Sequence, residues 1–320
     1  MNCHVALTGA SGFVGQGLVQ RLKAGGFGSP RALRLPASLF QNGGSALPSA
    51  DETANLSALW AQQLHGVEVL IHLAARVHVM NDTAQAPLSA FRAANVWGTQ
   101  QLARAAAGAG VKRFVYISSV KVNGESTEPG RPFGENDAPN PSDDYAQSKY
   151  EAESSLHDIA AQTGIQVVII RPPLVYGPGV RANLAALIGA VQRGLPLPLG
   201  AVHNKRSLIG LDNLCDLIAT CMCHAAAANQ TFMVSDGEDL STTVLIRRLA
   251  SAMGRPARLL SVPVPLLRAA ATLVGQSAAV RRLCGNLQVD TTKAHQLLGW
   301  RPAVSVDEGL RRTTVAMLRP

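Results

Sequence analysis

The feature that most constrains the fold of this chain is a glycine-rich turn near its start. An apolar run at residues 5–7 is followed by Thr8–Gly15, with glycines at positions 9, 12 and 15. Leu18, Val19 and Leu22 then recur at helical spacing. Glycines alone could form a turn that binds nothing, but these lie between a strand pattern and a helix pattern. That order is typical of a dinucleotide site, where glycine lets the backbone approach a pyrophosphate at a helix N-terminus.

Strand-like and helix-like patterns alternate from residue 1 to about 175. The near-continuous apolar runs at 67–73, 113–118 and 166–170 are typical of buried parallel strands. We therefore expect an α/β fold, a Rossmann-type doubly wound parallel sheet over 1–175, with ligands at the carboxyl ends of the strands. Beyond Tyr176, prolines and shorter elements indicate a smaller C-terminal substrate-binding lobe over 176–320. Parts of 205–240 are expected to return to the first domain.

The formal net charge of +8 raises the question of a nucleic-acid partner. The chain contains no Lys/Arg run, and its aromatic content of 4% leaves few residues for base stacking, so no nucleic acid is expected. A small anionic substrate would explain the excess of basic residues equally well. The longest apolar run, Val262–Val274, is interrupted by Arg268 and is too short to span a bilayer. We expect no membrane insertion, and a cytoplasmic location by default.

The five cysteines do not indicate a metal centre. Cys221 and Cys223 are separated by one residue rather than two, and no matching His/Cys pair flanks them. We expect buried thiols and no metal.

Two short motifs carry chemistry. Tyr145 and Lys149 are four residues apart at the start of an expected helix, which places both side chains on one face. A nearby ammonium should lower the pKa of the phenol from about 10, so that the tyrosine can exchange a proton with a substrate oxygen. Ser118 and Ser119 close a predicted strand at the sheet edge where ligands bind, and a hydroxyl there can bond the same oxygen.

These motifs, in this order, resemble the extended short-chain dehydrogenases/reductases of the NAD-dependent epimerase/dehydratase family. The resemblance covers nearly the whole chain and includes six segments: Thr8–Gly15, His72–Ala75, Asn95–Thr99, Ser118–Ser119, Tyr145–Lys149 and Arg171–Gly179. It implies a catalytic triad of Ser119, Tyr145 and Lys149. Ser119 is preferred because it stands five residues before Gly124, close to where the family places its serine.

The resemblance also implies binding residues. Lys149 would hold the nicotinamide ribose, Ala74 would line the nicotinamide loop, and Asn95 would support the active-site helix. The cofactor contacts expected from the motifs are Gly9, Ser11, Gly12, Phe13, Val14, Gly15, Leu73, Ala74, Ala75, Asn95, Tyr145, Lys149 and Pro172. The contacts expected with a UDP-sugar substrate are Ser118, Ser119, Lys121, Asn183, Arg206 and Arg282. A homodimer through helices at about 87–109 and 145–163 is expected by the same analogy.

The cofactor is expected to be NADP(H) rather than NAD(H). NAD-binding chains usually carry an acid about twenty residues after the glycines, for the ribose 2′-hydroxyl. Here that zone holds Arg31 and Arg34, and the first acid is Asp51. An arginine would attract a 2′-phosphate, so Arg34 is the expected contact, and Asp51 is expected near the adenine.

The residues after Ser119 narrow the range of reactions. Sugar 4,6-dehydratases of the family carry acids at this strand end, whereas this chain has Ser119-Val-Lys-Val. The segments Ser118–Glu125 and His72–Met80 resemble those of a subgroup of the family whose enzymes act in lipopolysaccharide O-antigen synthesis. We expect NAD(P)H-dependent reduction at C4 of a UDP-4-keto-6-deoxy-N-acetylhexosamine, giving a UDP-N-acetylquinovosamine-type sugar. A UDP-sugar 4-epimerase with tightly bound NAD is the alternative, and a non-catalytic NADP sensor is a minor one.

Overall fold

The computed structural model describes residues 3–36, 39, 47, 49–77, 87–273 and 275–318, so the end of the His72–Met80 string lies outside the described residues. A six-stranded sheet forms the centre of the first of two bodies. Its strand order is β2-β1-β3-β4-β5-β8, and every neighbouring pair is parallel. Its strands are β1 Val5–Thr8, β2 Arg31–Leu33, β3 Val69–His72, β4 Arg113–Ile117, β5 Gln166–Arg171 and β8 Gln230–Met233. The predicted doubly wound parallel sheet is confirmed.

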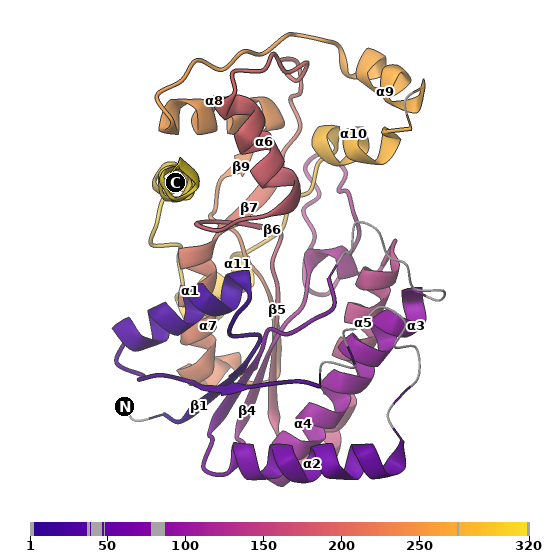
Figure 1. Cartoon of the computed structure of the whole chain (residues 1–320), viewed down its shortest axis with the longest axis vertical. Helices are drawn as coiled ribbons and strands as arrows, with labels where there is room; N and C mark the ends of the chain where they lie inside the picture. The colour runs from indigo at the N-terminus through magenta and orange to yellow at the C-terminus, as the bar shows by residue number, and fades with distance from the viewer. Residues whose placement is uncertain are drawn as a thin grey trace.

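Helices cover both faces of this sheet (Figure 1). Alternate residues of each strand face opposite sides, so Val5 and Leu7 pack toward one helix layer and Ala6 toward the other. The first layer contains α1 Phe13–Ala24, α7 Leu211–Cys223 and α11 Thr292–Leu298. The second layer contains α2 Ala50–Leu64, α4 Gly98–Gly108 and α5 Asp144–Thr163.

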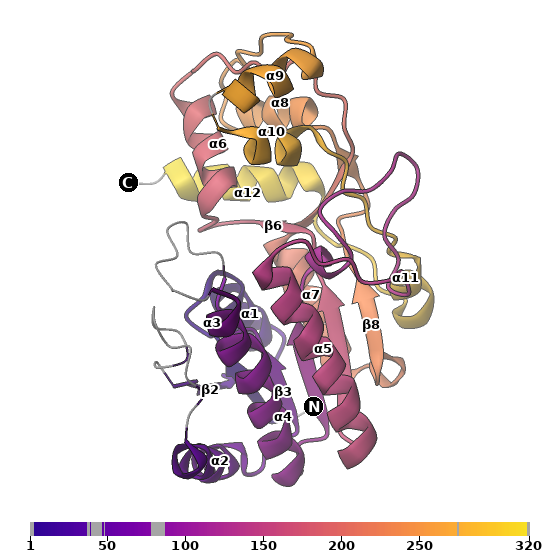
Figure 2. The same ribbon diagram turned by 90° about the vertical axis from the view of Figure 1, so that its right-hand side faces the viewer.

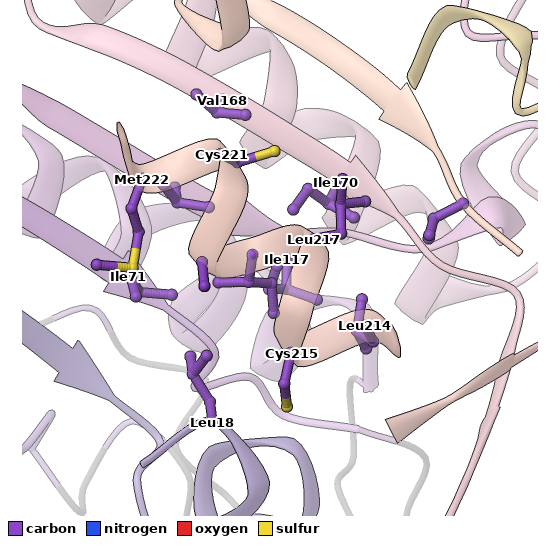
Figure 3. Packing of buried hydrophobic residues seen from close by; sticks show 14 of the residues in the cluster. Leu18, Ile71, Ile117, Val168, Ile170, Leu214, Cys215, Leu217, Cys221 and Met222 are labelled. Atoms are coloured by element: carbon purple, nitrogen blue, oxygen red, sulfur yellow. The ribbon is translucent and has the colours of Figure 1, made fainter. Parts of the chain in front are cut away.

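Helix α7 shows how the first layer closes the core. Its side chains Leu214, Leu217 and Met222 lie over Ile71 and Ile117 of the sheet (Figure 3). All of these side chains are buried. Residues 211–233 therefore supply a helix and the edge strand β8 to the same sheet that the first 171 residues build.

The rest of the chain after β5 forms a second body of mostly helices. A small sheet of order β6-β7-β9 lies at its base, with β6 Leu174–Tyr176 parallel to β7 Arg206–Gly210 and β9 Asp239–Leu240 antiparallel to it. The helices around it are α6 Ala182–Gln192, α8 Thr242–Ala252, α9 Val264–Leu273, α10 Ser277–Cys284 and α12 Val306–Leu318. In Figure 2 this body lies above the six-stranded sheet, at the end toward which the strands point.

One helix predicted at about 87–109 is divided into three parts. α3 Pro87–Phe91 leads into a π-helical segment, η2 Arg92–Trp97, and then into α4. A π-helix is rare and often marks a functional position. Two short 3-10 helices, η3 Val120–Val122 and η4 Ala225–Ala227, complete the described elements.

Candidate active site

The glycine-rich turn leaves no room for larger side chains. Gly9 has φ 72°, and a Cβ added there would come within 2.8 Å of the Ala74 backbone nitrogen after β3. A Cβ at Gly15 would stand 2.1 Å from the carbonyl oxygen of Gly9. Helix α1 begins after Gly12, and no side chain caps its N-terminus. A helix N-terminus with close backbone access is the arrangement that binds phosphate.

A buried chain of hydrogen bonds connects the turn to the neighbouring strand and helix. The Ala74 N–H donates to Thr8 Oγ1 at 3.3 Å, and Thr8 Oγ1 lies 2.6 Å from His72 Nδ1. On the far side, His72 Nε2 lies 3.0 Å from Thr99 Oγ1, which donates to the Asn95 carbonyl. Burial, with the charge of Lys149, lowers the pKa of His72 to about 3, so the ring is neutral. The histidine therefore acts as a fixed connector rather than a proton donor.

Asn95 connects the π-helical segment to the loop after β3 and to α5. Its Oδ1 accepts from the Arg76 N–H at 2.8 Å, and its Nδ2 donates to the Arg76 carbonyl at 3.0 Å. The same Nδ2 donates at 2.9 Å to Ser148 Oγ, which in turn donates to the Tyr145 carbonyl. A single amide thus fixes the loop that carries Ala74 and the helix turn that carries Tyr145.

Lys149 is buried beneath this helix turn. Its Nζ donates to the Ile117 carbonyl at the end of β4, at 2.8 Å, and lies 4.5 Å from the centre of the Tyr116 ring. The centre of the Tyr145 ring is 6.0 Å from the same nitrogen. Burial lowers the pKa of Lys149 to about 7, and the nearby charge of Glu153 opposes this shift.

The expected lowering of the Tyr145 pKa is not what the structure shows. Desolvation of the phenol raises this pKa, and the negative charge of Asp143 raises it further. Lys149 does not offset these two effects, because burial disfavours its ammonium form and its Nζ donates to a backbone carbonyl. Tyr145 is accordingly a neutral phenol at neutral pH, and it is in a state to give a proton rather than to take one.

The two serines at the end of β4 have different surroundings. Ser118 is buried, and its hydroxyl has no hydrogen-bond partner among the described residues. Ser119 is half-buried and caps η3, because its Oγ accepts from the Lys121 N–H at 3.2 Å.

An ion pair joins this serine turn to the start of α5. Lys121 Nζ lies 2.6 Å from Asp143 Oδ2 and 3.4 Å from Glu125 Oε1. The other carboxylate oxygen of Asp143 accepts from the Ala146 N–H at 2.7 Å and so caps the helix. The carboxyl end of β4 and the turn that carries Tyr145 are thereby held together, and Lys121, expected as a substrate contact, is already occupied in this bridge.

The residues expected around the adenosine lie at the edge of the sheet. Thr8 pairs with Leu33 in register, so Arg34 follows β2 at the carboxyl edge beside the glycine turn. Arg34 is exposed, and it makes no hydrogen bond or ion pair within the described ranges. Arg31 instead donates to carbonyls at the end of α2. Asp51 is exposed in the first turn of α2.

The expected diphosphate contacts come from three elements of the second body. Arg206 begins β7, and its Nη1 donates to the Arg282 carbonyl at 2.7 Å and to the Gly285 carbonyl at 3.2 Å. Burial lowers the Arg206 pKa, although the group stays a cation. Arg282 is exposed at the end of α10, and Asn183 is exposed in the first turn of α6.

A buried ion pair between α5 and β5 was not predicted from the sequence. Arg171 and Glu153 are 7% and 3% exposed and form a bidentate pair, with Arg171 Nε 3.0 Å from Glu153 Oε1. Arg171 Nη1 also donates to Asn123 Oδ1. Glu153 is one helical turn after Lys149, so a search for acids at i+4 would have found it. Arg171, the last residue of β5, thereby connects α5 through Glu153 to the segment after β4 through Asn123.

Comparison with known proteins decides the family. The family model described as NAD dependent epimerase/dehydratase family matches residues 5–235. The chain is 44% identical over 316 residues to a UDP-glucose 4-epimerase of Vibrio cholerae, covering 98% of this chain and 95% of that protein.

The chain belongs to the NAD-dependent epimerase/dehydratase family.

Solved structures with the same fold carry either nicotinamide cofactor. UDP-glucuronic acid 4-epimerase from Bacillus cereus, in complex with NAD, has a TM-score of 0.74 at 21% identity and covers 98% of each chain. RMD from Pseudomonas aeruginosa, complexed with NADPH, has a TM-score of 0.73 at 23% identity and covers 98% of this chain and 99% of that one. As a member of this family the chain is an NAD(P)-binding nucleotide-sugar enzyme.

The other residues expected to contact the cofactor also lie at the carboxyl edge. Ser11 is exposed on the turn, whereas Phe13 and Val14 are half-buried at the start of α1. Leu73 and Ala75 are half-buried after β3, and the Pro172 carbonyl after β5 accepts from the Val120 N–H at 3.1 Å. Among the described residues, no group of three or more His, Cys, Asp or Glu could hold a metal ion. No helix in the same ranges is long and apolar enough to cross a membrane.

Proposed function

We propose that this enzyme reduces C4 of a UDP-4-keto-6-deoxy-N-acetylhexosamine with NADPH, to give a UDP-N-acetylquinovosamine-type sugar for lipopolysaccharide O-antigen synthesis. The observation that carries the proposal is the grouping of Tyr145, Lys149 and the Ser119 turn at the carboxyl end of β4. The hydrogen bond from Lys149 to Ile117 and the Lys121–Asp143 pair hold these three residues at one place.

The residues present fit a dinucleotide. A cradle in which a Cβ at Gly9 or Gly15 would meet backbone, at an uncapped helix N-terminus, suits a pyrophosphate. Lys149 is the group that would hold the nicotinamide ribose. When bound, NADPH supplies the hydride that C4 receives.

The protein's own part in the reaction is to hold the sugar and to move one proton. The raised pKa keeps Tyr145 protonated at neutral pH, so its hydroxyl can donate to the C4 oxygen as that oxygen becomes a hydroxyl. The Ser119 hydroxyl would hydrogen-bond the same oxygen and orient it. In its protonated form Lys149 would stabilise the phenolate left behind, because a nearby ammonium favours the charged form.

Reduction is favoured over dehydration because the turn after Ser119 carries Val120 and Lys121 rather than acids. It is favoured over epimerisation by Arg34, which lies exposed at the end of β2 beside Gly9. An arginine there suits the 2′-phosphate of NADPH, a cofactor that a reductase must exchange in every cycle. Asp51, at the start of α2, is the proposed adenine-side contact.

A second candidate is a UDP-sugar 4-epimerase of the UDP-glucose or UDP-GlcNAc type. The observation that favours it is the 44% identity to the Vibrio cholerae UDP-glucose 4-epimerase. Such an enzyme would use the same Tyr145 first as base and then as acid, with a tightly held cofactor.

The substrate side of the proposal rests on three residues. Arg206, Arg282 and Asn183 would contact the diphosphate and the nucleotide, since a guanidinium pairs well with phosphate oxygens. Ser118 and Lys121 are retained as weaker substrate contacts. A cytoplasmic homodimer, formed through 87–109 and 145–163, stays a prediction.

A stoichiometric assay separates the two candidates. The purified chain is mixed with the UDP-4-keto sugar and either NADPH or NADH, and cofactor oxidation is followed against product. Oxidation of one cofactor for each keto sugar, faster with NADPH, is the expected result. Conversion of UDP-GlcNAc or UDP-glucose with no added cofactor would replace the reductase with the epimerase. A chain that binds NADP but converts neither substrate would be a sensor.

A further inference from the structure

Helix α9 has an apolar face that no part of the described chain covers. Leu266, Ala269, Ala270 and Leu273 recur at i, i+3, i+4 and i+7, and all four are exposed. The side chains of the two leucines are 61% and 88% exposed. In a globular protein a stripe with this spacing normally faces the core.

The opposite face of α9 is buried against the rest of the second body. Leu267 is buried in a small cluster of apolar side chains that also contains Ile246 of α8, and Ala271 is buried as well. The outward leucines therefore contribute nothing to the packing of the second body. Only Arg268 and Thr272 are polar in this helix, so α9 is apolar on both sides.

The segment around α9 carries nearly all of the net charge of the chain. Residues 240–289 contain seven arginines and not one Asp, Glu or Lys. The whole chain has 29 Lys and Arg against 21 Asp and Glu, so the residues outside this segment carry 22 basic against 21 acidic groups. Arg248 pairs with Glu238 and Asp307, whereas the other six are exposed, with no ion pair among the described residues. They are Arg247, Arg255, Arg258, Arg268, Arg281 and Arg282.

We propose that the outer stripe of α9 docks this enzyme on an anionic lipid bilayer, with Leu266 and Leu273 entering the headgroup region and the surrounding arginines other than Arg282 facing the lipid phosphates. An apolar helix face flanked by arginine has the composition of an interfacial helix. The position also suits a planar surface, because α9 lies at the extreme of the molecule farthest from α2 in both views (Figures 1 and 2). The contact is peripheral, since the ten residues of α9 are too few to span a bilayer.

The charge argues against a second copy of the chain as the occupant. Two copies meeting through this face would bring two sets of arginines together without acids to pair with them, and like charges at an interface oppose association. An anionic bilayer supplies both an apolar layer and the complementary charge. The docking does not depend on which sugar the enzyme converts.

The test is flotation of the full chain with vesicles of equal parts phosphatidylethanolamine and phosphatidylglycerol, compared with pure phosphatidylcholine vesicles. We expect binding to the anionic vesicles only, weakening as salt is raised. The double variant Leu266→Ser/Leu273→Ser should bind roughly tenfold more weakly or worse. Arg268→Glu should weaken binding less. The matched control is Leu59→Ser, an exposed leucine on α2 that is 45% exposed at the other end of the molecule.

Both α9 variants should keep the wild-type melting temperature and the wild-type rate on free UDP-sugar, because the changed side chains are exposed and lie outside the proposed site. Failure of the wild-type chain to float with anionic vesicles would overturn the proposal. Equal flotation of the wild type and the double variant would also overturn it. A dimer in solution that the double variant loses, without vesicle binding, would reassign the face to contact between copies.

Discussion

Two regions of this molecule handle charge in opposite ways. At the carboxyl edge of the six-stranded sheet, ionisable side chains are buried and held by hydrogen bonds, as with His72 between Thr8 and Thr99 and with Lys149 on the Ile117 carbonyl. In the cap of α8, α9 and α10, six of seven arginines are exposed and form no ion pair within the described residues.

The contrast between buried and exposed ionisable side chains shows where the proposed function lowers the stability of the fold. Burying Lys149 favours its neutral form, so the edge keeps this group at a cost in folding free energy, and the surrounding hydrogen bonds compensate. Exposed arginines in the cap carry no such cost. Substitutions at the edge should therefore change both chemistry and stability, whereas substitutions of exposed residues on α9 should change neither on free substrate.

The largest expected effect is at Tyr145. Tyr145→Phe removes the hydroxyl that donates the proton, and turnover should fall by about 10²–10⁴-fold while cofactor affinity is kept. Steady-state rates and a cofactor titration by fluorescence measure the two quantities. Leu273→Ser in the cap is the control and should leave both unchanged. Turnover within a few-fold of wild type in Tyr145→Phe would remove this residue from the mechanism.

The next effect is at the glycine turn. A Cβ at Gly15 would stand 2.1 Å from the Gly9 carbonyl oxygen, so Gly15→Ala should deform the cradle. We expect a loss of about 1–3 kcal/mol in the free energy of unfolding and weaker cofactor binding by calorimetry. Gly108→Ala in α4, where no atom lies within 4 Å of an added Cβ, is the matched control. If both variants bind cofactor like wild type, the turn does not form the cradle.

The third effect tests the cost of the buried amine. The pKa of Lys149 is about 7 in the folded chain, below its ordinary value, so between these two values the unfolded chain binds more protons. This group therefore destabilises the fold most below about pH 7, and stability rises with pH from there. Lys149→Met should be inactive but more stable by about 1–3 kcal/mol at pH 6.

The gain in Lys149→Met should shrink as the pH approaches 10, as followed by urea unfolding at several pH values. Arg255→Met in the cap should show a stability change near zero at every pH, because Arg255 is exposed. A gain in Lys149→Met that is the same at pH 6 and pH 10 would contradict the assigned pKa.

The smallest effect is at Arg34, an exposed residue of the edge. Arg34→Glu should raise the KM for NADPH by roughly tenfold, since a carboxylate repels the 2′-phosphate, and should leave the KM for NADH nearly unchanged. Lys23→Glu makes the same charge reversal on the exposed end of α1 and should shift neither value. Equal changes for both cofactors would mean that Arg34 does not read the phosphate.

Sequence patterns predicted the sheet well because each element there carries a local signal. The runs that became β3, β4 and β5 are continuously apolar, and the glycines of the first turn stand between a strand and a helix. The division of the helix over 87–109 had no such local signal; the π-helical segment contains Asn95, whose side chain bonds to residues distant in the sequence.

The sequence predicted which residues lie together at the candidate site, but it did not predict their protonation states. The spacing of Tyr145 and Lys149 placed both on one helix face, but the pKa of each is set mainly by its depth of burial, which no local pattern reveals. The role of Lys121 in a bridge to Asp143 depends in the same way on a contact 22 residues away. Motif spacing therefore predicts which residue types share the site, whereas contacts in the folded chain determine their protonation states and ion pairs.

The most direct test of the account is a labelled turnover. The wild-type enzyme receives the UDP-4-keto-6-deoxy-N-acetylhexosamine with NADPH that carries deuterium at the transferable position of the nicotinamide, and the product is examined by NMR. Reduction at C4 predicts one deuterium at C4 of the sugar for each NADPH oxidised, and turnover about 10²–10⁴-fold slower in Tyr145→Phe. Product with hydrogen at C4, or sugar conversion without oxidation of NADPH, would contradict C4 reduction as the reaction of this enzyme.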